Sequence, residues 1–216
     1  MTATASAERT GGARDWWLRT LLVVQRPRPV FVALRDESKQ ALSDRSEQVL
    51  LIVLLSGIAY ALASPTGAQL MDDSAYDGLL VAVWAFLAGG IVGLFGYFTL
   101  GAFLFVGVKA LGSQGTYRRA RHVLAFASVP LALSLVLWPV KLALYGEDVF
   151  RSGGKDVGGG ALAFNVLEFA FAAWALVLLV TGVRAVHGWT AARAGAACAL
   201  AAAIPVAAGL LVATVH

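Results

Sequence analysis

A run of about 33 apolar residues, from Gly78 to Ala110, constrains the fold of this chain more than any other feature. As a single α-helix it would be roughly 50 Å long, whereas the hydrocarbon core of a bilayer is about 30 Å thick. Two helices of about 16 residues would each be too short to cross that core, and no polar turn divides the run. The sequence therefore predicts one tilted or kinked transmembrane helix that extends beyond the membrane on the Lys109 side.

The overall composition agrees with a membrane protein. Of the 216 residues, 59% are hydrophobic and only 14% are charged, which is too apolar for the surface of a soluble globule of this size. The formal charge of +4 could suit nucleic acid. However, the basic residues lie beside hydrophobic segments, which indicates membrane orientation and attraction to anionic lipid, with no nucleic-acid partner. The single cysteine, Cys198, lies in an apolar run, which excludes a disulfide within one chain.

Four further apolar runs have transmembrane length, so the expected fold class is all-α, a polytopic bundle of five membrane-spanning helices. Residues 1–14 are rich in small and polar residues and are expected to be disordered. Residues 15–45 are expected to form amphipathic helices at the cytoplasmic interface, ahead of a membrane domain over residues 46–216. The expected spans cover residues of about 46–64, 79–110, 123–145, 161–183 and 191–215.

The distribution of lysine and arginine predicts the orientation. Eight of these residues precede the first span, none lies in the acidic loop over residues 66–77, and four lie between Lys109 and Arg121. Because basic residues gather on the cytoplasmic side, the N-terminus is expected in the cytoplasm and the C-terminus outside, in the plasma membrane. Lys141, Arg151 and Lys155 are an exception on the outer side.

Two tryptophans mark a short apolar segment near the N-terminus. Asp15 to Gln25 is too short to span, and Trp16 and Trp17 cluster on one side of it between flanking arginines. The favoured interpretation is a helix in the membrane interface with both tryptophans at headgroup depth. The alternative, that the segment packs against the other helices, has equal support.

Small residues and prolines predict how the spans pack. Gly89 and Gly93 continue a four-residue spacing from Ala85, which favours close approach of another helix. Pro130 and Pro139 interrupt the third span. Each proline lacks a backbone donor, so a bent helix is expected there, with the freed carbonyl satisfied inside the protein.

Two ionisable side chains fall within the expected hydrocarbon region, Lys141 and Glu168. Antiparallel neighbouring spans would place them at similar depth, so a structural ion pair is favoured. The alternative makes Glu168 a proton or cation site together with Asn165, which lies one turn before it.

A basic cluster, Arg118, Arg119 and Arg121, precedes the third span and could bind lipid phosphates or an acidic partner. Its alternative role is to set the topology alone. His122 and His187 are expected to form interfacial hydrogen bonds, because a histidine pair without a carboxylate is a poor metal site. No catalytic set can be assembled from the motifs, and no cofactor or metal is expected.

Three motifs resemble those of the Yip family of Ypt/Rab-interacting membrane proteins. They are the Leu-Gly-x-x-Gly-Thr-Tyr turn at Leu111 to Tyr117, the aromatic-x-x-x-Pro pattern at Phe126 to Pro130, and TGVRAVHGW at Thr181 to Trp189. The resemblance covers roughly residues 46–215 and implies a cytosolic N-terminus and five spans. Eukaryotic members bind small GTPases and each other in vesicle traffic, but the acidic Asp-Leu-Tyr-Gly-Pro-like motif of those members is missing here. The Ala, Gly, Val and Arg bias suggests the bacterial branch.

The function expected from these observations is that of a membrane scaffold or partner-binding protein, not an enzyme. Its expected partners are membrane lipids, a membrane or cytosolic protein, and further copies of itself. The alternative is a small-solute or proton-coupled transporter with Glu168 as its intramembrane site. A transporter is expected to show internal repeats or paired broken helices, and five unequal spans show neither.

Overall fold

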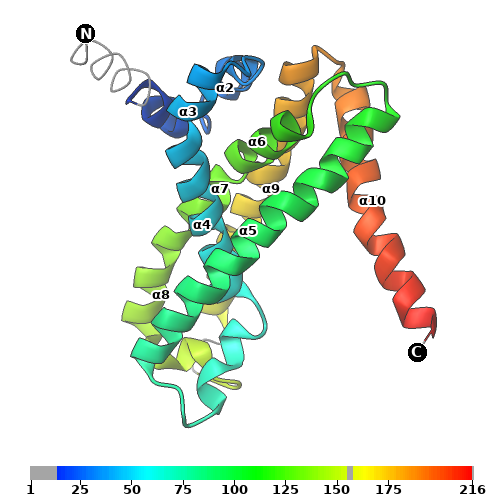
Figure 1. Cartoon of the computed structure of the whole chain (residues 1–216). Helices are drawn as coiled ribbons and strands as arrows, with labels where there is room; N and C mark the ends of the chain where they lie inside the picture. Colours follow the sequence, from blue (N-terminus) through cyan, green and yellow to red (C-terminus); the bar gives the residue numbers. More distant parts are fainter. Residues whose placement is uncertain (1–13, 155–157, 216) are drawn as a thin grey trace. The chain divides into compact units, whose positions relative to one another are not determined.

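The computed structural model describes residues 14–154 and 158–215, and the regular structure in these ranges is entirely helical (Figure 1). The expected disordered start lies outside the described residues except for Arg14, which begins a helix over residues 14–22. The elements that follow are α2 (Pro27–Ala33), α3 (Lys39–Asp44), α4 (Ser46–Ala63), η1 (Gly67–Asp72), α5 (Gly78–Ala110), α6 (Tyr117–Ala127), α7 (Val129–Leu133), η2 (Ser134–Val136), α8 (Leu137–Tyr145), η3 (Gly146–Phe150), α9 (Gly159–His187) and α10 (Ala191–Val215).

Among the described residues, four helical segments are long and apolar enough to cross a membrane, and the described apolar part of α10, Ala191–Ala207, is shorter. The all-α membrane fold class is therefore confirmed. The apolar run from Gly78 to Ala110 forms one helix, α5. The four segments are Lys39–Ala63, Gly78–Ala110, Tyr117–Phe150 and Gly159–His187.

The third of these segments is broken where its first proline lies. α6 ends at Ala127, and Pro130 is in the first turn of α7, where its missing N–H costs no helical hydrogen bond. Next to the break, the Ser56 hydroxyl of α4 donates to the backbone oxygen of Ser128 at 3.1 Å. A backbone carbonyl at the break thus gains a partner inside the protein, as a membrane environment requires. Pro139 lies in the first turn of α8.

The described residues group into two compact units, and several helices contribute to both. The first unit contains the described residues up to Leu50 together with Tyr97–Ala127 and the chain from Leu176 onward. The second unit contains Leu51–Gly96 and Ser128–Ala175. Each unit is described by itself below.

In the second unit, α4 and α5 approach closely through glycines. A Cβ atom added at Gly57 would lie 2.6 Å from Gly93 Cα, and one added at Gly89 would lie 2.5 Å from Ile58 Cα. One added at Gly93 would overlap the backbone oxygen of Val53. Gly89 and Gly93 therefore lie in a helix contact in which a larger side chain has no room, which agrees with their spacing.

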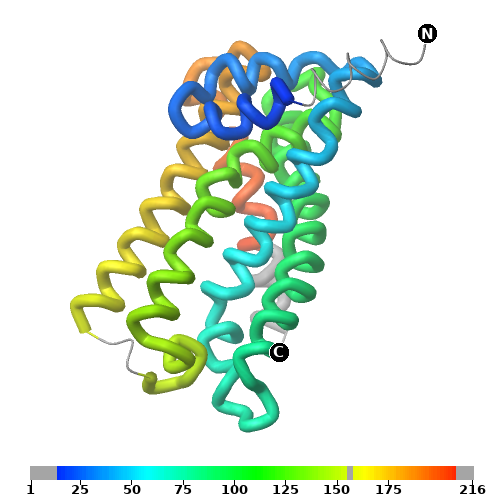
Figure 2. The backbone as a smooth tube through the Cα atoms, turned by 90° about the vertical axis from the view of Figure 1, so that its left-hand side faces the viewer, coloured from blue at the N-terminus to red at the C-terminus, as the bar shows by residue number. Residues whose placement is uncertain are grey.

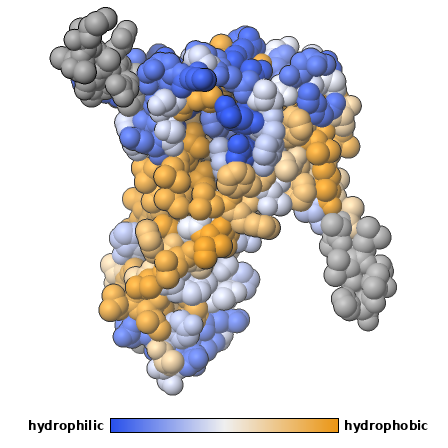
Figure 3. Space-filling model, in the orientation of Figure 1, coloured by the Kyte–Doolittle hydropathy of each residue, from blue (hydrophilic) through white to orange (hydrophobic). Residues whose placement is uncertain are grey.

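The loop end of the second unit has its own small core. Trp138 of α8 stacks on Phe150 of η3, with ring centroids 5.7 Å apart. These rings pack with Met71, Val81 and other buried apolar residues. The first half of α9 runs beside α8 (Figure 2). Over this unit, hydrophobic residues cover the helices and hydrophilic residues gather at the loops (Figure 3).

Candidate functional site

The three arginines of the basic cluster lie in the first two turns of α6, in three different environments. Arg118 is exposed, whereas Arg119 and Arg121 are half-buried. The Thr116 hydroxyl oxygen accepts a hydrogen bond from Arg119 N at 3.1 Å, which caps the start of the helix. The arginines consequently cannot act as one interchangeable patch.

Arg119 is committed to contacts inside the first unit. Its Nη2 lies 2.7 Å from Glu37 Oε2 and donates to the Arg35 backbone oxygen at 3.1 Å. The Thr116 hydroxyl also donates to Glu37. Both side chains of the ion pair are about one-fifth exposed, so the pair is screened by water only in part. The Arg119–Glu37 ion pair thus holds the segment between α2 and α3 against the start of α6.

Arg121 lies in an aromatic cage. The centre of its guanidinium is 4.5 Å from the Tyr117 ring, 4.6 Å from the Phe98 ring and 5.0 Å from the Tyr97 ring. The Tyr117 hydroxyl donates to the Phe98 backbone oxygen at 2.7 Å, which holds α6 against α5. Cation–π attraction positions the charge without neutralising it.

Arg45 is completely buried beside this cluster, between α3 and α4. Its Nε donates to His122 Nδ1 at 3.0 Å, and its Nη1 donates to the Asp36 backbone oxygen at 2.9 Å. Because Arg45 is the donor, His122 must present an unprotonated Nδ1. The guanidinium also lies 5.4 Å from the Trp16 ring. Arg45 therefore links three segments that are distant in sequence.

A second arginine of the N-terminal helices closes the end of α9. Arg35 donates from Nε to the Val186 oxygen at 3.0 Å and from Nη2 to the Ala185 oxygen at 2.5 Å. These carbonyls lie in the last turn of α9, where helical partners run out and a cation is favourable. The N-terminal helices are thus bonded to both α6 and α9.

The two neighbouring tryptophans take opposite environments. Trp16 is only 5% exposed and packs on Phe126, with ring centroids 5.5 Å apart. Trp17 is 37% exposed, next to the exposed apolar residues Leu18 and Leu21. Trp16 therefore packs against the other helices, as the alternative interpretation has it. Trp17 lies on the outward apolar face.

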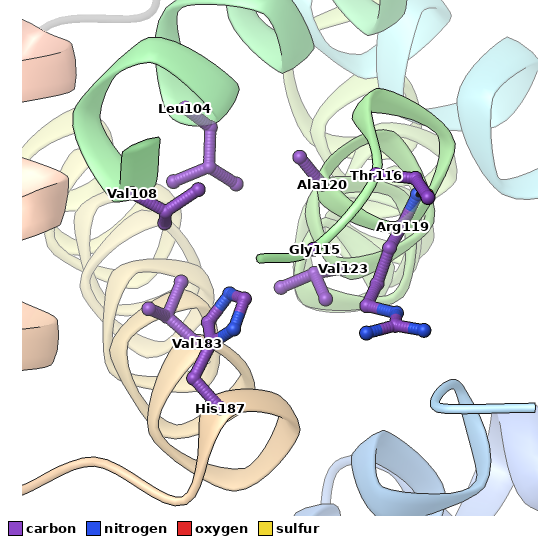
Figure 4. A pocket seen from close by; sticks show the side chains of 9 residues that line it. All are labelled: Leu104, Val108, Gly115, Thr116, Arg119, Ala120, Val123, Val183 and His187. Carbon is purple, nitrogen blue, oxygen red and sulfur yellow. Dashed lines mark hydrogen bonds between the residues drawn. The ribbon is translucent and has the colours of Figure 1, made fainter. Parts of the chain in front are cut away.

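A small pocket opens between α5, α6 and the end of α9 in the first unit (Figure 4). Its volume of about 10 Å³ is near the smallest that admits one water molecule. His187 lies at its rim, with Nδ1 3.3 Å from the Ser113 hydroxyl. That hydroxyl also accepts from Gly115 N at 2.9 Å, so the loop before α6 is tied to α9. The pocket is lined by Leu104, Val108, Gly115, Thr116, Arg119, Ala120, Val123, Val183 and His187.

In the second unit, Lys141 of α8 and Glu168 of α9 lie side by side. Lys141 Nζ is 3.1 Å from Glu168 Oε1, and it also lies 4.5 Å from the Trp138 ring. The side chains are 12% and 22% exposed. Asn165 is exposed on the surface of α9. The favoured ion pair is thus present, and Asn165 is not part of it.

His122 and His187 serve different contacts, with Arg45 and with Ser113. Among the described residues, no group of three His, Cys, Asp or Glu side chains is placed to hold a metal ion.

Sequence reasoning missed Arg35, Glu37 and Arg45 as parts of this cluster. The first apolar run begins at Val49, with Gln48 directly before it and Arg45 three residues before Gln48. Both side chains are fully buried. These two polar residues at the start of the first expected span were the available signal, because a polar side chain inside a span needs a partner within the protein.

These observations define an all-helical multi-pass membrane protein with arginines bonded across its helix ends. The family model of the Yip1 domain matches residues 21–214, and the chain therefore belongs to the Yip family. The match begins well before residue 46, so α2 and α3 are part of the family domain. Searches of the curated proteins and of the solved structures return no match.

Proposed function

We propose that this Yip-family protein is a scaffold of the plasma membrane, with its N-terminus in the cytoplasm, that presents basic side chains to an acidic partner protein at the cytoplasmic membrane edge. The observation that carries the proposal is the exposed Arg118 on a helix start that other residues hold in place. Arg119 and Arg45 supply that support through Glu37 and His122.

Preorganisation is the physical reason for assigning Arg118 the contact role. A long basic side chain on a mobile segment must lose conformational entropy when it binds, whereas a fixed helix reduces that cost. The side chain of Arg118 forms no hydrogen bond or ion pair within residues 14–154 and 158–215. Its guanidinium is free to form a bidentate contact with a carboxylate.

An exposed apolar face on the first helix would hold the protein at the membrane surface. Trp17, Leu18 and Leu21 form an exposed apolar face on the helix over residues 14–22. An amphipathic helix with flanking arginines binds at a lipid interface. This face would lie on the membrane surface. The helix would then hold Arg45 and the residues that it contacts at the level of the lipid headgroups.

The transporter alternative requires an acid that exchanges a proton or cation near the middle of the membrane. Glu168 is engaged by Lys141, which supports a structural role for the acid. No separate observation favours transport.

The test is site-directed cross-linking from the exposed Gln114, which precedes α6. A photoreactive residue at Gln114 would be activated in native membranes of cells that carry wild type, Arg118→Glu or Arg184→Glu. Arg184 is the matched control because it is exposed in the last turn of α9. We expect one protein adduct, reduced at least tenfold by Arg118→Glu and less than twofold by Arg184→Glu. Equal yields from the two variants would contradict the proposal.

A further inference from the structure

The caged guanidinium of Arg121 has no acidic partner among the residues that the structure describes. The ion pairs among the described residues join Arg119 to Glu37 and Lys141 to Glu168, and Arg121 takes part in neither. Its Nε is buried without a hydrogen-bond partner. The two terminal nitrogens are not buried in this way and form no hydrogen bond in residues 14–154 and 158–215. They are available to an anion from outside.

The length of α5 puts the cage near the expected boundary of the membrane. Asp77 precedes α5, so the hydrocarbon core begins near Gly78. At 1.5 Å per residue a core of about 30 Å takes roughly 20 residues and ends near Tyr97 and Phe98. These are two of the three cage residues. Aromatic rings at this level are typical of the membrane interface, where lipid phosphates lie.

The surroundings distinguish a lipid from a soluble anion. Phe98, whose ring contacts the guanidinium, is 49% exposed. An acyl chain would cover this apolar surface while its phosphate meets Arg121. Arg121 has no acid paired with it among the described residues. An unpaired cation favours a lipid of net negative charge over a zwitterionic one.

We infer that Arg121, held by Tyr97, Phe98 and Tyr117, binds the phosphate of one anionic phospholipid whose acyl chain lies along α5. The planar guanidinium gives the two parallel hydrogen bonds that a phosphate accepts. This inference deepens the proposed function and rests on it only for the side of the membrane. Arg118 serves the protein partner, whereas Arg121 serves the lipid.

Gly101 makes the cage possible. A Cβ atom there would overlap Arg121 Cγ and lie 3.3 Å from Arg121 Cβ. Gly101→Ala would therefore displace the guanidinium while leaving every charge in place. Gly90→Ala is its matched control on α5, because a Cβ at Gly90 meets only Leu54 Cδ2 at an ordinary 3.6 Å.

The experiment measures lipid retention by native mass spectrometry of the purified full chain. Protein in detergent would be titrated with dioleoylphosphatidylglycerol or with dioleoylphosphatidylcholine. We expect wild type to retain one phosphatidylglycerol at least fivefold more strongly than phosphatidylcholine. Arg121→Lys keeps the positive charge but removes the planar guanidinium group. Gly101→Ala keeps the charge and the guanidinium but displaces them. Each should weaken phosphatidylglycerol retention at least fivefold, while Arg118→Gln and Gly90→Ala change it less than twofold.

Three results would overturn the inference. One is equal retention of the two lipids, and another is a loss from Arg118→Gln as large as that from Arg121→Lys. The third is displacement of the lipid by millimolar inorganic phosphate, which would indicate an anion site without lipid. If the Arg121→Lys protein does not fold, the Gly101→Ala protein provides the test in its place. The two proposals can be tested separately. If Arg118→Glu loses the protein adduct at Gln114 but retains the lipid normally, the protein contact depends on Arg118 and the lipid contact does not.

Discussion

The buried side chain of Arg45 connects three segments of the first unit. It joins the Asp36 carbonyl, His122 of α6 and the ring of Trp16, and it has no exposed surface. One guanidinium can do this because its donors point in fixed, divergent directions.

Arg45→Ala should therefore lower the free energy of unfolding by about 2 to 4 kcal/mol, through the cavity and the unpaired groups that remain. Arg45→Lys should recover less than half of the loss, because one ammonium cannot reproduce the fork. Thermal unfolding in detergent measures both. Arg26→Ala, at an exposed position, is the control, and equal stability of Arg26→Ala and Arg45→Ala would show that the network is dispensable.

Asp72 predicts a pH dependence in the loops of the second unit. Hydrogen bonds from the side chain and backbone of Ser152 lower the pKa of Asp72 below its ordinary value of 3.8, and Ser152 N lies 2.7 Å from Asp72 Oδ1. A lowered pKa in the folded state means that the contact stabilises fully above the ordinary pKa and is lost as pH falls through the folded value.

Hydrogen exchange at the Ser152 amide should consequently stay protected from pH 7 to about pH 5 and lose protection below about pH 4. Asp72→Asn should remove that pH dependence, whereas Asp73→Asn, one position along the same exposed loop, should preserve it. An unchanged profile in Asp72→Asn would mean that another group protects the amide.

At the scale of elements, the contact between α4 and α5 depends on the absence of side chains. Gly57, Gly89 and Gly93 leave no room for a Cβ atom against the facing backbone. Backbone cannot give way as a flexible side chain can, so a methyl group there must separate the helices.

Gly57→Ala should lower the free energy of unfolding by at least 1 to 3 kcal/mol, the range expected for overpacking. Gly90→Ala, one residue from the contact and with only an ordinary neighbour at 3.6 Å, should be neutral or slightly stabilising because alanine favours a helix. Denaturant unfolding in micelles compares the two. A Gly57→Ala protein as stable as Gly90→Ala would show that the helices do not touch there.

At the scale of the whole molecule, the role of the Lys141–Glu168 pair distinguishes the scaffold hypothesis from the transporter hypothesis. Lys141→Met or Glu168→Gln should each cost roughly 2 kcal/mol or more, because one charged partner remains in an apolar setting. The exchanged protein, with Glu at position 141 and Lys at 168, should recover at least half of the summed loss. A double variant no more stable than that sum would exclude a direct interaction.

The same pair predicts the absence of transport. Purified protein in liposomes that carry a pH gradient should show no proton or sodium flux above empty vesicles, measured with an internal pH dye. A flux that Glu168→Gln abolishes would replace the scaffold with the transporter. A flux unaffected by that change would indicate leak through the bilayer.

The orientation is tested by cysteine labelling in a Cys198→Ser background. A cysteine at the exposed Ser74 should react with a membrane-impermeant thiol reagent added outside intact cells, and one at the exposed Gln114 should not. Gln114 is a better probe than its neighbour Ser113, which is buried. Labelling of Gln114 from outside would invert the topology.

Properties that depend on neighbours along the chain could be predicted from the amino-acid sequence. The single helix from Gly78 to Ala110 followed from hydropathy and length, and the break at Pro130 followed from its missing backbone donor. The family also followed from short motifs, and the match over residues 21–214 confirmed it. Hydropathy and backbone chemistry are local, so they can be derived without knowing which segments meet.

Which polar side chains are buried, and what they contact, depends on the packing of distant segments. Trp16 and Trp17 are adjacent, yet one is buried on Phe126 and the other faces outward. The Arg118 side chain has no ion-pair partner in the described part of the chain, whereas its neighbour Arg119 is paired with Glu37, 82 residues away. The local sequence around such residues is nearly the same. Their roles differ because burial depends on which distant helix packs against each face, and no local pattern contains that information.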